Sequence, residues 1–179
     1  HRYEIRHWLP VLAGLTIENK ATSERFVYDY RKTESDLLIH SHYETGSDFL
    51  KDYGIEFVGE AGGPGPPIWD TCPVDALKAL GNVTVPRGEF WIQHRNMFLI
   101  KEVASAAHIY GKPVVDAESF TTWRRWEDSP FELKKSADRA FAEGLNRITI
   151  HGFAHSPDSA GLPGFTYHAG IDINPNTTW

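Results

Sequence analysis

The stretch 111–122, which reads GKPVVDAESFTT, decides the predicted fold. Its Gly-Lys-Pro opening interrupts a helix, and Val114 and Val115 then form a short apolar run typical of a buried strand. Asp116 and Glu118 follow where the strand that we expect over 113–117 ends. Because an ionised carboxylate in a core is costly unless it is paired or used, both acids are candidates for a functional site.

A helix-then-strand order recurs along the chain. Residues 96–110 place apolar side chains at helical spacing directly before the strand described above. Residues 23–42 predict an amphipathic helix with Thr22 or Ser23 as its N-cap, ahead of a short strand at 55–59.

A third unit follows downstream. A helix is expected to open at Ser129-Pro130 and to end at Gly144, before a strand at 147–150. Three such units predict an α/β fold with parallel strands, because parallel neighbours need crossovers of this length. We therefore expect a partial (β/α)8 TIM-like barrel, with residues 1–179 as a single segment of it.

A doubly wound sheet is the alternative fold. It would bind ligands at the same strand ends, but the expected nucleotide fingerprint is missing. The Gly/Pro cluster at 59–67 has prolines where a helix N-terminus should receive phosphate.

Composition excludes several classes of protein. A net charge of -6 argues against nucleic acid or an anionic membrane as partner. No apolar run of about 18 residues occurs, so no membrane span is expected. The single cysteine, Cys72, excludes an internal disulfide and a cysteine-based zinc site.

Glu60, Glu118 and His151 each follow a predicted strand. In a β/α barrel that end of the strands carries the chemistry. Glu118 is the best single candidate, as a general base, a nucleophile or a metal ligand. The alternative is a structural carboxylate paired with an arginine.

Glu89 lies in the stretch 86–91, PRGEFW, where we expect a loop rather than a strand. Its neighbours Phe90 and Trp91 could desolvate it and raise its pKa, as a general acid requires. An equal alternative is that Glu89 is a structural acid near the N-terminus of the next helix, where its negative charge interacts favourably with the helix macrodipole.

His151 and His155 form a His-x3-His pair, a spacing that suits zinc on a helix. Here it begins at a strand end and runs into a proline loop, so hydrogen bonding to a ligand is the favoured interpretation. His40 and His42 have the His-x-His spacing of a metal-dependent amidohydrolase, but they fall within a predicted helix.

Tryptophans among polar neighbours are natural platforms for stacking on sugar rings, although large rings also fill cores. Trp91, Trp123 and Trp126 are examples. Together with carboxylates at strand ends they suggest glycoside hydrolysis, which needs two carboxyl groups across a sugar ring.

Several segments resemble glycoside hydrolase family 106, the α-L-rhamnosidases. They cover nearly the whole chain in order and comprise 2–10, RFVYDYRKTESDLL at 25–38, PRGEFW at 86–91, KEVASAAHIYGKPVVDAESFT at 101–121, AFAEGLNRITIHGFAH at 140–155, PGFTY at 163–167 and NTTW at 176–179. The resemblance implies that residues 1–179 are a segment of a (β/α)8-type catalytic domain from a longer multidomain enzyme. It further implies that this enzyme hydrolyses terminal α-L-rhamnosides in rhamnose-containing oligo- or polysaccharides with inversion. It also implies a periplasmic or extracellular location.

The resemblance further implies residue roles. Glu118 would be the general base that activates water, and Glu89 would share that task or hold the water. Substrate contacts are expected from Glu60, Trp91, Asp116, His151 and His155. Calcium is implied near the substrate, without assigned ligands.

The general acid of the family sits in an Asp-Ser-Trp-Glu-like motif that should fall shortly before His1. A non-catalytic carbohydrate-binding remnant is therefore kept as one alternative, and the His40–His42 spacing keeps an amidohydrolase-type enzyme as another.

Overall fold

The computed structural model describes residues 2–61 and 72–177. Most of the Gly/Pro cluster at 59–67 and the last two residues of the NTTW motif lie outside these ranges. Within the described ranges, no helix combines the length and the hydropathy that a bilayer-spanning segment requires.

The described strands form one parallel sheet. They are β1 (Val58–Gly59), β2 (Val85–Trp91), β3 (Asp116–Thr121) and β4 (Arg147–Ile150), and they neighbour one another in the order β1-β2-β3-β4. A doubly wound sheet reverses its strand order at a switch point, whereas strands in sequential order are those of a β/α barrel. The predicted α/β fold with parallel strands is confirmed.

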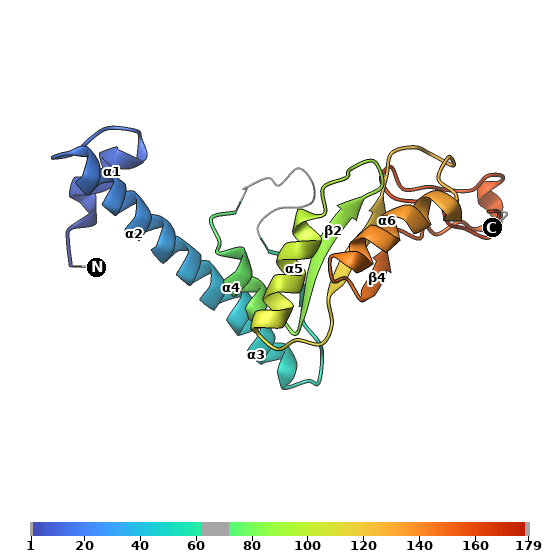
Figure 1. Cartoon of the computed structure of the whole chain (residues 1–179), viewed down its shortest axis with the longest axis horizontal. Helices are drawn as coiled ribbons and strands as arrows, with labels where there is room; N and C mark the ends of the chain where they lie inside the picture. Colours follow the sequence, from blue (N-terminus) through green and yellow to red (C-terminus); the bar gives the residue numbers. More distant parts are fainter. Residues whose placement is uncertain (1, 62–71, 178–179) are drawn as a thin grey trace.

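Three helices of the described residues lie between the strands: α4 (Ala76–Gly81), α5 (Phe98–Ile109) and α6 (Pro130–Ala142). In Figure 1, α5 and α6 lie over the same face of the sheet. A large core cluster includes Phe90, Ile100 and Ala117. Gly88 lets β2 approach α5, because a Cβ there would meet Val103 Cγ2 at 2.9 Å.

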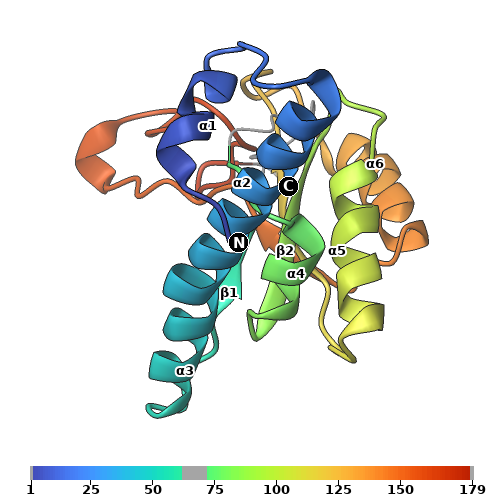
Figure 2. The same cartoon turned by 90° about the vertical axis from the view of Figure 1, so that its left-hand side faces the viewer.

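The chain before the sheet is helical. It comprises α1 (Ile5–Leu12), α2 (Lys20–Leu38), the π-helix η1 (Ile39–Glu44) and α3 (Thr45–Lys51). Figures 1 and 2 show α2 running away from the sheet as an arm on which α1 folds back. The predicted helix is confirmed, but it starts earlier because the Asn19 side chain accepts a hydrogen bond from the Thr22 backbone amide at 3.0 Å.

Three strand predictions need correction. β1 is confined to Val58–Gly59, and β3 begins at Asp116, so Asp116 and Glu118 lie inside the strand rather than at its tip. Glu89 lies in β2, where we expected a loop. Pro86 and Gly88 are poor strand formers, and pairing with strands on both sides overrides that local preference.

Candidate active site

The inner face of the sheet, opposite the helices, carries the candidate residues. Because Gly88 faces α5, the alternation of side chains turns Arg87 and Glu89 to the other face. In the parallel register Glu89 lies beside Glu118, and Glu118 lies beside Thr149. The sheet therefore brings two glutamates from separate strands next to each other.

Glu89, Glu118 and His151 form a compact cluster. A carboxylate oxygen of each glutamate and a ring nitrogen of His151 all lie within 4.8 Å of one another. His151 Nδ1 is 3.0 Å from Glu118 Oε1, and the two side chains are 20% and 35% exposed. These three predicted site residues are thus brought together on the inner face of the sheet.

Glu89 is held by two donors. The Trp91 indole N–H and the Thr121 hydroxyl, at 3.0 Å, both donate to Glu89 Oε1. Burial raises the pKa of Glu89, and the two hydrogen bonds limit that increase. Trp91 therefore orients a carboxylate. Its ring also packs edge-on against Trp123, with centroids 4.8 Å apart, and Trp123 is 50% exposed.

Glu60 follows β1 and is electrostatically coupled to this cluster. Burial, followed by the negative charges of Glu118 and Glu89, raises the pKa of Glu60 from 4.5 to about 7. The Glu60 side chain is therefore a carboxyl group that holds its proton near neutral pH.

Asp116 lies two residues before Glu118 in β3, on the same face of the sheet, and is 0% exposed. The guanidinium groups of Arg87 and Arg147 lie 2.6 and 3.3 Å from its carboxylate, and the Thr149 hydroxyl donates to it at 3.0 Å. Burial alone would raise the pKa of Asp116, but the hydrogen bonds from Arg147, Arg87 and Thr149, together with the charge of Arg87, outweigh burial and lower this pKa. These contacts support a structural role beneath the glutamates rather than contact with a sugar.

Other predicted residues lie outside the cluster. His155 is exposed in the loop after β4, with no hydrogen bond or ion pair to any described residue. His40 and His42 lie in η1, where His40 Nδ1 is 3.0 Å from Glu44 Oε2. The amidohydrolase alternative, which needs such a pair at a strand end, is not supported.

Calcium does not fit the cluster of Glu89, Glu118 and His151. Calcium takes six to eight oxygen ligands, whereas this cluster offers an imidazole nitrogen and two carboxylates. One carboxylate oxygen, Glu89 Oε1, already accepts two hydrogen bonds.

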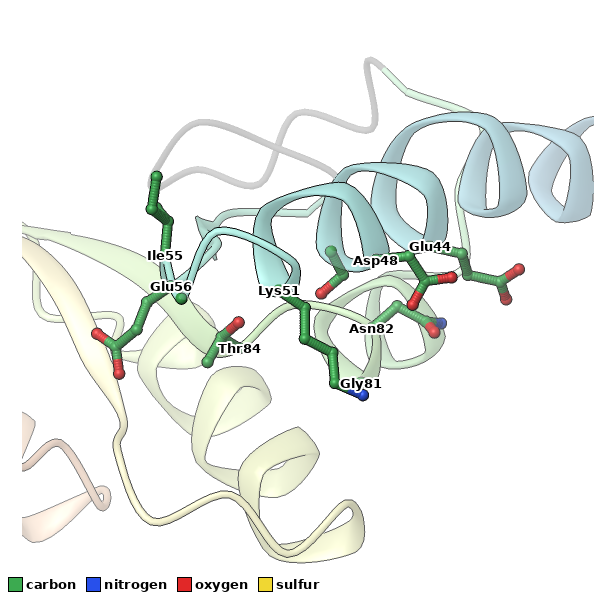
Figure 3. Close-up of a pocket in the computed structure, with 10 residues that line it drawn as sticks. Glu44, Asp48, Lys51, Ile55, Glu56, Gly81, Asn82 and Thr84 are labelled. Carbon is green, nitrogen blue, oxygen red and sulfur yellow. The ribbon is translucent and has the colours of Figure 1, made fainter.

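A hollow of about 690 Å³ lies elsewhere (Figure 3). Its lining residues include Lys51 and Ile55, which come before β1 in the sequence, and Thr84, which comes directly before β2. It is therefore at the amino ends of the strands, the end associated with stability in β/α barrels rather than with chemistry.

Thr121 was missed by the sequence interpretation. It is 2% exposed and contacts both Glu89 and His151. The only sequence signal is its place in the Ser-Phe-Thr-Thr run, and strict alternation in β3 would turn it toward the helices.

A comparison with known protein families identifies the family of the chain. A profile of the α-L-rhamnosidases, glycoside hydrolase family 106, matches residues 1–179. The chain belongs to this family. The predicted resemblance is confirmed.

Two relatives are similar over most of this α-L-rhamnosidase-family chain. A Formosa agariphila protein with the provisional name β-glucuronidase is 36% identical over 179 residues, covering 99% of the chain. The structure of a rhamnosidase from Novosphingobium sp. PP1Y is 34% identical, with a TM-score of 0.71 over 83% of the chain. The chain spans 15% of the first protein and 14% of the second.

Proposed function

We propose that the protein is an inverting α-L-rhamnosidase in which Glu118 is the general base. The observation that carries the proposal is the cluster of Glu89, Glu118 and His151 on neighbouring parallel strands. Family membership supports the substrate class. Residues 1–179 would then be one segment of a β/α-barrel catalytic domain.

The separation of the two glutamates limits the roles that they can share. Inverting glycosidases place their acid and base about 6.5–9.5 Å apart, with a water beside the base. Oxygens of Glu89 and Glu118 lie within 4.8 Å of each other, which is too close for that pair and nearer to the roughly 5–5.5 Å of a retaining pair, so the proposal of inversion rests on the family resemblance and not on this distance. Both then act on the water side of the sugar, and the general acid comes from sequence outside this segment.

The two glutamates have different surroundings. Glu89 is 8% exposed and accepts two hydrogen bonds on one oxygen, which suits a residue that orients the water. Glu118 is more exposed and has His151 beside it. A partly exposed carboxylate next to an imidazole is well placed to take a proton from water.

The charge of the cluster favours a neutral sugar. Glu89 and Glu118 would repel the carboxylate of a glucuronide, and the guanidinium of Arg87 is paired with Asp116. Rhamnose carries no charge. We therefore favour rhamnosides over the glucuronides that the name of the F. agariphila relative indicates.

The test is hydrolysis of aryl α-L-rhamnosides and aryl β-D-glucuronides by the full-length protein. We expect turnover of the rhamnoside, with β-L-rhamnose as the first product seen by proton NMR. First formation of α-L-rhamnose would contradict inversion, and binding of rhamnose without turnover would favour the non-catalytic alternative.

Family resemblance also motivates a proposed periplasmic or extracellular location. Cell fractionation with antibodies against the protein tests it, and recovery in the cytoplasmic fraction would contradict it.

A further inference from the structure

A β-bulge near the end of β3 changes the direction of two side chains. Phe90 pairs with Ser119, but Trp91 pairs with Thr121, so Phe120 is the extra residue. Phe120 has a φ of 70°, a left-handed conformation that is unfavourable for a bulky side chain. Its ring packs edge-on against the buried Phe90, with centroids 5.2 Å apart. The bulge thus turns Phe120 to the core and Thr121 to the inner face.

Thr121 links Glu89 to His151. Its hydroxyl donates to Glu89 Oε1 at 3.0 Å and lies 2.9 Å from His151 Nδ1. A hydroxyl has one proton, and a carboxylate can only accept. With that proton directed at ionised Glu89, Thr121 Oγ1 must accept from His151, so Nδ1 carries a proton.

Glu118 leads to the same protonation by a separate contact. Its Oε1 lies 3.0 Å from His151 Nδ1, and a bare Nδ1 lone pair would repel this carboxylate oxygen. Within the described residues, no hydrogen bond involves His151 Nε2. A neutral imidazole with its proton on Nδ1 therefore has a free acceptor at Nε2.

We propose that Thr121 is a positioning residue that, together with Glu118, keeps the proton of His151 on Nδ1, so that Nε2 accepts a hydrogen bond from a sugar hydroxyl. The inference rests on the proposed function for its substrate class. It assigns a role to a residue that touches the histidine and not the sugar, comparable to groups that set the tautomer of a catalytic histidine in other hydrolases.

The kinetic test uses Thr121→Val and Thr121→Ser in the full-length protein. Valine keeps the shape without the hydroxyl, and we expect kcat/KM for an aryl α-L-rhamnoside to fall about tenfold to a hundredfold, as for one buried hydrogen bond left unmade. Serine should restore most of the activity. Ser119→Ala is the matched control, because it removes a buried β3 hydroxyl that donates to the Ala117 carbonyl, and it should behave as wild type.

Neutron diffraction from crystals of the full-length protein tests the tautomer without any variant. We expect a deuteron on His151 Nδ1 and none on Nε2. A deuteron on Nε2 would overturn the proposal, as would an unchanged kcat/KM in Thr121→Val. If the wild type hydrolyses no rhamnoside, the proposed function fails, and the deuteron position still decides whether His151 has the tautomer that Thr121 and Glu118 are proposed to hold.

Discussion

Glu118 is the residue on which the proposed chemistry depends most directly. It combines partial exposure with contact to His151, and Glu89 on the next strand faces the same space. We expect Glu118→Gln to lower kcat about a thousandfold or more, because removing a general base typically costs about 10²–10⁴-fold. Steady-state kinetics with an aryl α-L-rhamnoside measure this, and an unchanged circular dichroism melt shows that the fold is intact. Near-normal turnover would rule out the role.

Glu60 makes a separate prediction about pH. Its pKa is raised from 4.5 to about 7, so the folded protein binds this proton more tightly than the unfolded chain. The resulting stabilisation is complete below pH 4.5 and is lost as the pH rises through about 7. Glu60→Gln should therefore stabilise the protein more at pH 8 than at pH 5, by about 1–3 kcal/mol.

Chemical denaturation of wild type and Glu60→Gln at the two pH values measures that difference. Glu56→Gln is the matched control, because Glu56 is an exposed carboxylate in the same segment. Equal effects of Glu60→Gln on stability at both pH values would show that the pKa of Glu60 is not raised in the folded protein.

At the scale of elements, the contact between β2 and α5 depends on a missing side chain. In Gly88→Ala the new Cβ would lie 2.9 Å from Val103 Cγ2 and 3.1 Å from the Leu99 carbonyl oxygen. We expect this variant to lose about 1–3 kcal/mol of unfolding free energy through overpacking. Because Glu89 follows directly, kcat should also fall.

Gly111→Ala is the comparison for that experiment. Gly111 ends the turn after α5 with a φ of 66°, and a Cβ added there would meet no atom of the described residues within 4 Å. Its substitution should cost about 1 kcal/mol from backbone strain and leave kcat unchanged. Equal kinetic effects of the two variants would show that close packing at Gly88 does not position Glu89.

At the scale of the whole molecule, a network of ion pairs around one buried carboxylate joins three strands next to the cluster of Glu89, Glu118 and His151. Asp116 of β3 pairs with Arg87 of β2 and Arg147 of β4. Removing its charge leaves two guanidinium groups without their partner, so we expect Asp116→Asn to lose about 2–4 kcal/mol. Denaturant unfolding at pH 7 measures this loss.

The stabilisation by Asp116 depends on pH in the opposite sense to that of Glu60. Because the pKa of Asp116 is lowered from 3.8, its stabilisation is present above pH 3.8 and is lost as the pH falls below it. The difference between wild type and Asp116→Asn should therefore shrink in acid. A constant difference would contradict the ion-paired state of Asp116.

Much of the fold could be predicted because its signals are local. The helices over 96–110 and 130–144 follow from apolar spacing and from glycine or proline at their ends, and the structure confirms both. β2 could not be predicted, because Pro86 and Gly88 argue against a strand that only its two neighbours stabilise. The same limit applies to the start of β3, where two arginines from other strands make a buried Asp116 acceptable.

The sequence by itself determined the α/β class, the parallel strands, the family and the candidate residues Glu89, Glu118 and His151. Only the tertiary structure decided which of these meet and that Thr121 joins them. The physical reason is separation along the chain: Thr121 lies 32 positions from Glu89 and 30 from His151. Contacts over such distances depend on strand register and on the bulge at Phe120, and neither has a local sequence signal.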